Sequence, residues 1–123
     1  MTHKLLLVDD SGLARRSMRA MLEPAGFEVI EAEDGMAALE RYSVDKPDLV
    51  ILDLVMKGMY GLDVLAKIRE LDPSARVVVV SADVQQSSQD MVHAAGAVGF
   101  LNKPVERDRV LSVLRGALER PAS

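Results

Sequence analysis

The feature that most constrains this sequence is its alternation of short aliphatic runs with longer segments of helical period. Runs such as Leu5 to Val8 and Val77 to Val80 contain only leucine and valine, as strands do when both faces of a sheet are covered. Between the runs, apolar residues recur at spacings of three and four, which is typical of amphipathic helices. The alternation therefore predicts βα units around a parallel sheet, an α/β fold.

The expected elements follow from where each pattern begins and ends. Strands are expected at Lys4–Val8, Glu28–Ala32, Leu49–Asp53, Arg76–Ser81 and Val98–Leu101. Helices are expected from about Ala14 to a C-cap at Gly26, from Met36 to Tyr42 with Asp34 as N-cap, from Leu62 to a stop at Asp72 and Pro73, from Val84 to Ala95, and from Glu106 to Leu118. The segment 84–90 has one apolar residue in seven. We therefore expect weak burial there until Met91, Ala94 and Ala95, and hence mobility.

Length and composition limit the classes of function. A chain of 123 residues suits a single domain, 1–123, that buries roughly two thirds of its unfolded surface. Cysteine is absent, and the longest aliphatic runs have four residues, far short of the roughly 20 that a membrane span needs. The formal net charge of −4 argues against a basic surface for nucleic acid. We expect a soluble, cytoplasmic protein with no direct contact to nucleic acid or membrane.

Polar side chains follow four of the five expected strands. Asp9 and Asp10 come after the first strand, Asp53 ends the third, Ser81 ends the fourth, and Lys103 comes shortly after the fifth. In open parallel sheets, ligand chemistry lies at the carboxyl ends of the strands, where the strand order reverses. We therefore expect these five side chains to converge on one edge.

Most of these residues also have a simpler interpretation. The segment Asp9 to Ser11 suits the cap of a following helix, Lys103 is ordinarily a solvated lysine, and Ser81 is ordinarily a turn residue. Asp53 is different, because no capping role for it is apparent. An ionised group beside an apolar core is costly unless it is paired, hydrogen-bonded or bound to a metal.

Four motifs resemble those of a known family. "LLLVDDS", "VILDL", "VVVVSA" and "GFLNKP" are similar to the signature of the response-regulator receiver domain of two-component signal transduction, in the CheY-like superfamily. The resemblance runs from Leu5 to about Leu118 and is strongest to single-domain chemotaxis-type regulators. It implies a flavodoxin-like, doubly wound five-stranded parallel sheet flanked by five helices. The strand order 2-1-3-4-5 is also taken from the family.

The resemblance implies a role for each residue of the expected site. Asp53 is then the phosphoacceptor, which takes a phosphoryl group from a phosphohistidine of a sensor kinase or phosphotransfer protein. Asp9, Asp10 and Asp53 hold Mg²⁺ together with the backbone carbonyl of Val55. Lys103 pairs with the phosphoryl group.

The resemblance also implies a switch. Ser81 moves toward the phosphoryl group, and Phe100 turns inward into the space that Ser81 vacates. The fourth helix is the bistable element, and the surface made by the fourth helix, fifth strand and fifth helix binds a downstream protein. The Lys103–Pro104 peptide is often cis in this family.

Two residues depart from the family pattern in the loop after the third strand. Lys57 stands where a proline is usual and Tyr60 where an acidic residue is usual. Loss of the proline frees backbone torsions, so we expect a more mobile loop. Val55, Lys57, Asp83 and Pro104 are expected to modulate the site, and the positions of Val55 and Asp83 are those that tune the lifetime of the phosphoaspartate in this family.

Several alternatives stay open at this point. Arg15, Arg16 and Arg19 lie opposite the apolar face of the first helix and are either solvated or a docking surface for the kinase. The chain is either a stand-alone regulator or the receiver part of a longer DNA-binding transcription factor. A metal-dependent phosphohydrolase is a third hypothesis, although the D-x-D arrangement of such enzymes is missing after the first strand. Otherwise the chain is not expected to be an enzyme beyond its own phosphotransfer and autodephosphorylation.

Overall fold

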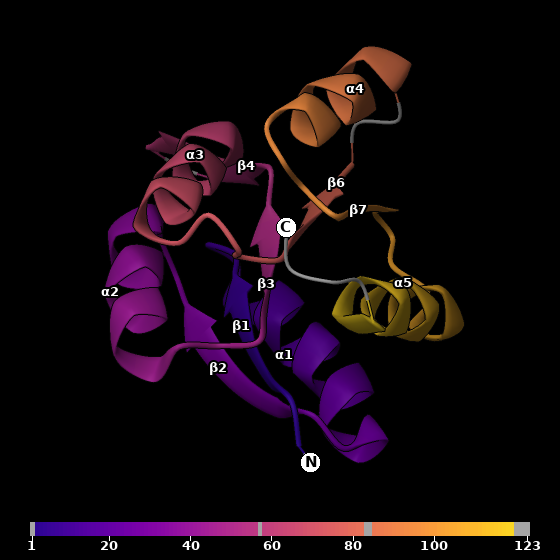
Figure 1. Ribbon diagram of the computed structural model, residues 1–123. Coiled ribbons are helices and arrows are strands. Elements are labelled where there is room, and N and C mark those ends of the chain that lie inside the picture. The colour runs from indigo at the N-terminus through magenta and orange to yellow at the C-terminus, as the bar shows by residue number, and fades with distance from the viewer. Residues whose placement is uncertain (1, 57, 83–84, 120–123) are drawn as a thin grey trace.

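A five-stranded parallel sheet lies between two layers of helices (Figure 1). The computed structural model describes residues 2–56, 58–82 and 85–119. The strands are β1 (Lys4–Val8), β2 (Glu28–Ala32), β3 (Leu49–Asp53), β4 (Val55–Met56), β5 (Met59–Tyr60), β6 (Val77–Ser81) and β7 (Gly99–Asn102). The helices are α1 (Gly12–Leu22), the 3₁₀ turn η1 (Glu23–Ala25), α2 (Gly35–Asp45), α3 (Gly61–Leu71), α4 (Gln86–Ala94) and α5 (Arg107–Glu119).

The sheet has the order β2-β1-β3-β6-β7, which confirms the expected order 2-1-3-4-5. From β1 the chain moves outward to β2 and then returns to the other side of β1, where β3 pairs in parallel. The direction of winding therefore reverses between β1 and β3. Val8 pairs with Leu52 at this point, so the residues that follow β1 and end β3 meet where an open α/β sheet places its ligands.

Side chains alternate between the two faces of the sheet. Leu6, Val8, Val50 and Leu52 point into the core beneath α2 and α3, whereas their neighbours Leu5, Leu7, Leu49 and Ile51 point into the core beneath α1 and α5. All eight are at most 3% exposed. Because successive strand residues face opposite sides, burial of both faces requires an uninterrupted aliphatic run. Asp53 ends such a run and is therefore nearly buried.

Several element boundaries differ from the expectation. The first helix ends at Leu22, and Pro24 lies in the 3₁₀ turn that leads to Gly26, whose φ of 97° reverses the chain. β6 begins at Val77 and β7 spans Gly99–Asn102, because the strand ends are decided by pairing with their neighbours. The cap at Asp34 is confirmed, since its side chain accepts a hydrogen bond from the Ala37 amide.

The expected burial of Met91 is wrong, and Met36, the first residue of the expected second helix, is exposed as well. Met91 of α4 is 51% exposed and Met36 of α2 is 78% exposed. In α4, Val92 is fully buried instead, so this helix meets the core one residue later than its spacing indicated. Its first turn, from Gln86, contains no described buried side chain. Val84 lies outside the described residues.

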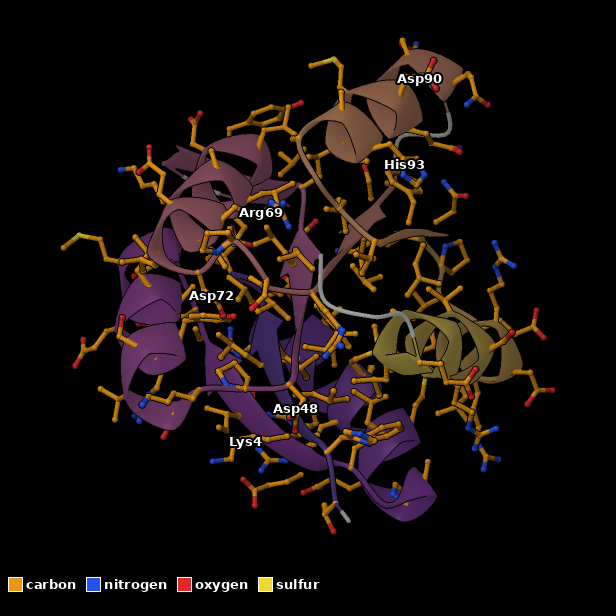
Figure 2. All side chains as sticks on the ribbon, viewed as in Figure 1. Lys4, Asp48, Arg69, Asp72, Asp90 and His93 are labelled. Atoms are coloured by element: carbon orange, nitrogen blue, oxygen red, sulfur yellow. The ribbon has the colours of Figure 1, made fainter. Side chains whose placement is uncertain are left out.

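Polar contacts between distant parts of the chain connect the elements at the edge of the sheet opposite the carboxyl ends. The Lys4 amide donates to the Asp48 carboxylate at 2.7 Å, and the two residues lie together in Figure 2. Across α2 and α3, the Tyr42 hydroxyl donates to Asp72 at 2.7 Å. Burial and this bond raise the pKa of Tyr42. Among the described residues, no helix has the length and apolar character that crossing a membrane requires.

Burial on α3 gives a test of the fold. Ile68 is fully buried whereas Leu71, three residues later, is 57% exposed. We predict that Ile68→Ala lowers the free energy of unfolding by about 2–5 kcal/mol, because it removes core contacts and leaves a cavity. Leu71→Ala should stay within about 0.5 kcal/mol of the parent chain. Urea denaturation followed by circular dichroism measures both, and equal losses would contradict this packing of α3.

Candidate functional site

The site is built around the carboxylate of Asp53, the last residue of β3. Its backbone continues the sheet, since it pairs with Val80 of β6 and the following Leu54 amide donates to the Val80 carbonyl at 2.9 Å. Asp53 is 8% exposed. The aliphatic strand thus delivers a carboxylate to the mouth of the core, on a backbone that is held on both sides.

Two more carboxylates come from the turn between β1 and α1. One oxygen each of Asp9, Asp10 and Asp53 lies within 4.8 Å of the others. Ser11 caps α1 by accepting from the Ala14 amide at 3.1 Å, and its own amide donates to Asp9 Oδ1 at 2.9 Å. The capping interpretation therefore holds for Ser11, while the two aspartates belong to the acidic cluster.

Lys103 lies between two of these carboxylates. Its Nζ is 3.3 Å from Asp9 Oδ2 and 3.3 Å from Asp53 Oδ2. Its backbone amide donates to the Ser81 carbonyl at 2.8 Å, and its peptide bond to Pro104 is cis. The ammonium group is thus brought to the acidic cluster by the loop after β7, 50 residues along the chain from Asp53.

The charges in this cluster shift each other's protonation. Burial, helped by the nearby Asp9 carboxylate, raises the pKa of Asp53, and the attraction of Lys103 opposes this shift without cancelling it. Burial alone would lower the pKa of Lys103, but the attraction of Asp53 and Asp9 outweighs it and the pKa is raised. The lysine therefore stays charged, while the carboxylates carry an excess of negative charge that favours a bound cation.

The donor set fits a hard divalent cation. Three carboxylates offer oxygen atoms at one point of the sheet edge, and oxygen is the ligand that Mg²⁺ prefers; Mg²⁺ is usually held by one or two carboxylates together with water and phosphate oxygens. Nitrogen or sulfur ligands are missing from this cluster of described residues. The composition of the cluster therefore suits Mg²⁺ better than zinc or copper.

The loop after Asp53 folds into a short hairpin. β4 and β5 pair antiparallel, with Val55 opposite Tyr60. The Val55 amide donates to Asp53 Oδ1 at 3.4 Å, and the Val55 side chain is 64% exposed. Gly61 then starts α3 so close to the strand that an added Cβ would lie 2.7 Å from the Asp53 carbonyl oxygen. Lys57, expected to modulate the site, lies outside the described residues.

The residues of the expected switch lie on β6 and β7, the two strands that follow β3 in the sheet. Ser81 ends β6, is 2% exposed and pairs with Asn102 of β7. Phe100 of β7 pairs with Val79 of β6 and is partly buried against the core beneath α2 and α3. Phe100 also lines a groove of about 340 Å³ between α4, β7 and α5. Asp83, expected to modulate the site, lies outside the described residues.

Arg15 contributes to the site through a contact that the sequence did not reveal. Arg15 and Arg19 of α1 are not simply solvated, because both bind Glu31 of β2. Arg15 also donates to the Asp9 carbonyl oxygen at 2.6 Å. No spacing rule connects these residues, since Arg15 and Glu31 are 16 positions apart. The sequence feature that could have indicated these contacts is Glu31, because an acidic residue within a strand paired to buried β1 needs a basic partner nearby.

This fold and this cluster define a class of protein. The sequence profile of the response regulator receiver domain matches residues 5–115. The chain belongs to this family, and its function is that of a receiver in two-component signal transduction. The resemblance seen in the four motifs is confirmed.

Among relatives, the chemotaxis proteins CheY are similar over nearly the whole chain. The CheY of Bacillus subtilis is 40% identical over 119 residues, which cover 96% of this chain and 99% of that protein. The CheY of Listeria monocytogenes is 43% identical over 115 residues, covering 93% and 97%. Among solved structures, a CheX–CheY complex with BeF₃ and Mg²⁺ from Borrelia burgdorferi is similar with a TM-score of 0.90 and 30% identity, covering 96% of this chain and 90% of that one.

The raised pKa of Asp53 gives a prediction for the metal-free protein. Between the ordinary pKa of an aspartate and the raised value, the folded state binds more protons than the unfolded state, so stability falls as pH rises through this window. Asp53→Asn removes this loss. We predict that the melting temperature of Asp53→Asn, relative to the parent chain, is higher at neutral pH than at about pH 4, near the ordinary aspartate pKa.

Thermal melts in a chelating buffer at both pH values measure this difference. Asp63→Asn is the matched control, because Asp63 lies exposed in the first turn of α3. A difference between Asp53→Asn and the parent chain that does not change with pH, or changes in the opposite direction, would contradict the buried, repelled state of this carboxylate.

Proposed function

We propose that Asp53 is the phosphoacceptor of this receiver domain, and that residues 1–123 act as one domain. The observation that carries the proposal is the contact of Lys103 Nζ, 3.3 Å from both Asp9 and Asp53. It joins a nearly buried carboxylate to a fixed cation and a second acid. A carboxylate nucleophile beside fixed positive charge is what phosphoryl transfer requires, because that reaction depends mainly on alignment and electrostatic stabilisation.

The proposed step transfers phosphorus from nitrogen to oxygen. An Asp53 carboxylate oxygen forms a bond to the phosphorus of a phosphohistidine on a sensor kinase or phosphotransfer protein. The phosphorus–nitrogen bond breaks, and the imidazole leaves with the bonding electrons and takes a proton from solvent. Asp53 needs no general base, because its ionised carboxylate is itself the nucleophile, and the adjacent Lys103 favours that form. His3 and His93 are both exposed and have no part in this step.

Asp9, Asp10 and Asp53 are the residues that would hold Mg²⁺, and we assign the Val55 backbone carbonyl as a further ligand. When bound, Mg²⁺ supplies positive charge to the incoming phosphoryl oxygens. Three carboxylates, one ammonium group and a divalent cation sum to no net charge, so the nucleophile meets no anionic barrier. Lys103 keeps its charge throughout and pairs with the phosphoryl group after transfer.

The switch follows from the charge that remains after transfer. A phosphoryl group at Asp53 is more negative than the carboxylate it replaces, and its excess charge attracts hydroxyl and ammonium donors. Ser81 ends the neighbouring strand, and its carbonyl already accepts from the Lys103 amide. We propose that Ser81 moves toward the phosphoryl group and that Phe100 turns into the space it leaves. The first turn of α4, with little burial, yields to this change.

The proposed output is the α4–β7–α5 surface, formed by Gln86–Ala94, Gly99–Asn102 and Arg107–Glu119. This surface contains a groove whose lining includes Gln89, Arg109 and the proposed switch residue Phe100. We propose a downstream protein as its partner and a chemotaxis-type role, in line with the CheY relatives. This chain needs no nucleic-acid contact for that role. It catalyses only its own phosphotransfer and autodephosphorylation.

Acetyl phosphate tests the phosphoacceptor. We predict that acetyl phosphate with Mg²⁺ adds the mass of one phosphoryl group to the chain, because a small phosphodonor can replace the kinase when the protein supplies the alignment. Asp53→Asn should abolish the addition, and Asp63→Asn should not. Intact-mass spectrometry reads all three. Undiminished labelling of Asp53→Asn would overturn the assignment, and repeated turnover of a phosphomonoester would favour a phosphohydrolase.

Beryllofluoride tests the switch. As a phosphoryl mimic bound at Asp53, it should shift the amide NMR signals of Ser81, Phe100 and α4, because these elements are proposed to move together. Signals of the amino-terminal end of β1 and of Asp48, at the opposite edge of the sheet, should stay unchanged. Shifts confined to residues next to Asp53 would leave the acidic site without the proposed output.

A further inference from the structure

Arg15 contacts the acidic cluster through the backbone of Asp9 and not through its carboxylate. Its Nη1 donates to the Asp9 backbone carbonyl at 2.6 Å, and its Nε donates to Glu31 Oε1 at 2.9 Å. The Arg15 side chain is 18% exposed. One planar guanidinium thus joins helix α1, strand β2 and the turn that carries Asp9.

Glu31 is a rigid anchor for this contact. It lies within β2, opposite Leu7 of β1, so its backbone is held by the sheet. Its second oxygen accepts from Arg19, which also donates to the Val29 carbonyl at 3.3 Å. A carboxylate that is held by two arginines and a paired strand presents its oxygens in one place, and Arg15 takes its orientation from them.

We propose that Arg15 is a positioning residue for the cation and phosphoryl site, because it fixes the backbone of Asp9. The proposal rests on the function assigned to Asp9 above. Asp9 is then held at four points: its amide donates to the Ala32 carbonyl at 3.2 Å, its carbonyl accepts from Arg15, its Oδ1 accepts from the Ser11 amide and its Oδ2 accepts from Lys103. A fork of fixed donors can serve the Asp9 carbonyl and the Glu31 carboxylate at once, which the single ammonium of a lysine does less well.

Electrostatics and positioning predict opposite results when Arg15 is removed. Loss of a cation next to three carboxylates should strengthen the binding of Mg²⁺, because the remaining field is more negative. Loss of the Asp9 anchor should weaken it, since groups that orient metal ligands typically contribute about tenfold or more to metal affinity. The sign of the change therefore distinguishes the two effects.

Two neighbouring arginines provide matched controls. Arg16 is on the same helix and exposed, so Arg16→Met reports the loss of one charge alone. Arg19→Met removes a second arginine from Glu31, and no contact between Arg19 and Asp9 is found among the described residues. It therefore reports the loss of a salt bridge with Glu31 while the Arg15–Asp9 contact stays.

The experiment is an NMR titration of the full chain with MgCl₂, without any phosphodonor, that follows the amides of Asp9, Asp10 and Ser11. We expect Arg15→Met to raise the Kd for Mg²⁺ about tenfold, and Arg16→Met and Arg19→Met to leave it unchanged or lower. Thermal melts of each variant show whether loss of stability accompanies the change. Arg15→Lys, which keeps the charge, should still weaken binding several-fold and serves if Arg15→Met does not fold.

The outcomes separate this inference from the proposed function. If the parent chain binds Mg²⁺ and Arg15→Met binds it equally or more tightly, Arg15 is only a structural residue and the inference is overturned. If Arg19→Met weakens binding as much as Arg15→Met, the effect belongs to the Glu31 salt bridges and the inference is likewise overturned. If the parent chain itself shows no Mg²⁺ binding, the assigned role of the acidic cluster fails first.

Discussion

The site depends on one interaction, the approach of the Lys103 ammonium to the carboxylates of Asp9 and Asp53. Burial and the nearby Asp9 carboxylate make the ionised form of Asp53 costly, and the attraction of Lys103 offsets part of that cost. Without Lys103, the carboxylates would either move apart through mutual repulsion or become protonated. With it, the ionised form of Asp53 is favoured at the opening of an apolar core, and that is the form which the proposed phosphoacceptor needs.

The sheet converts this local balance into a connection between distant elements. Backbone bonds run from Leu54 to Val80 and from Lys103 to Ser81, so the strand that ends in Asp53, the strand that ends in Ser81 and the loop that carries Lys103 are neighbours in one hydrogen-bonded layer. Phe100 lies on β7, the strand next to β6, and packs against the core beneath α2 and α3. The proposed change of charge at Asp53 would therefore act on residues that already share backbone contacts, and α4, whose first turn contains no described buried side chain, is the element proposed to respond.

Prediction from the sequence succeeded where the physics is local. Aliphatic runs located the strands of the five-stranded sheet to within one residue of their observed starts, and Asp34 marked a helix start; the hairpin of β4 and β5 was not predicted, and Gly26, expected to cap the first helix, caps the 3₁₀ turn after it. Helix faces were less certain. Met91 was expected to be buried, yet it is exposed and Val92 is buried instead, because the side of a helix that meets the sheet is decided by the neighbours it packs against. Arg15 was interpreted as either a solvated charge or part of a docking surface for the kinase, and its contact with Glu31 was missed because that residue comes from another element.

The sequence by itself determined the type of each element and the chemical identity of the residues at the strand ends, because hydrophobic period and residue type are written along the chain. Its motifs also indicated the family and, through it, the strand order. Only the tertiary structure decided which oxygens meet, that Lys103 lies between Asp9 and Asp53, and that Arg15 turns back to the Asp9 carbonyl. Those contacts join residues up to 94 positions apart. Their distances depend on register, loop path and side-chain packing, which arise when the whole sheet closes.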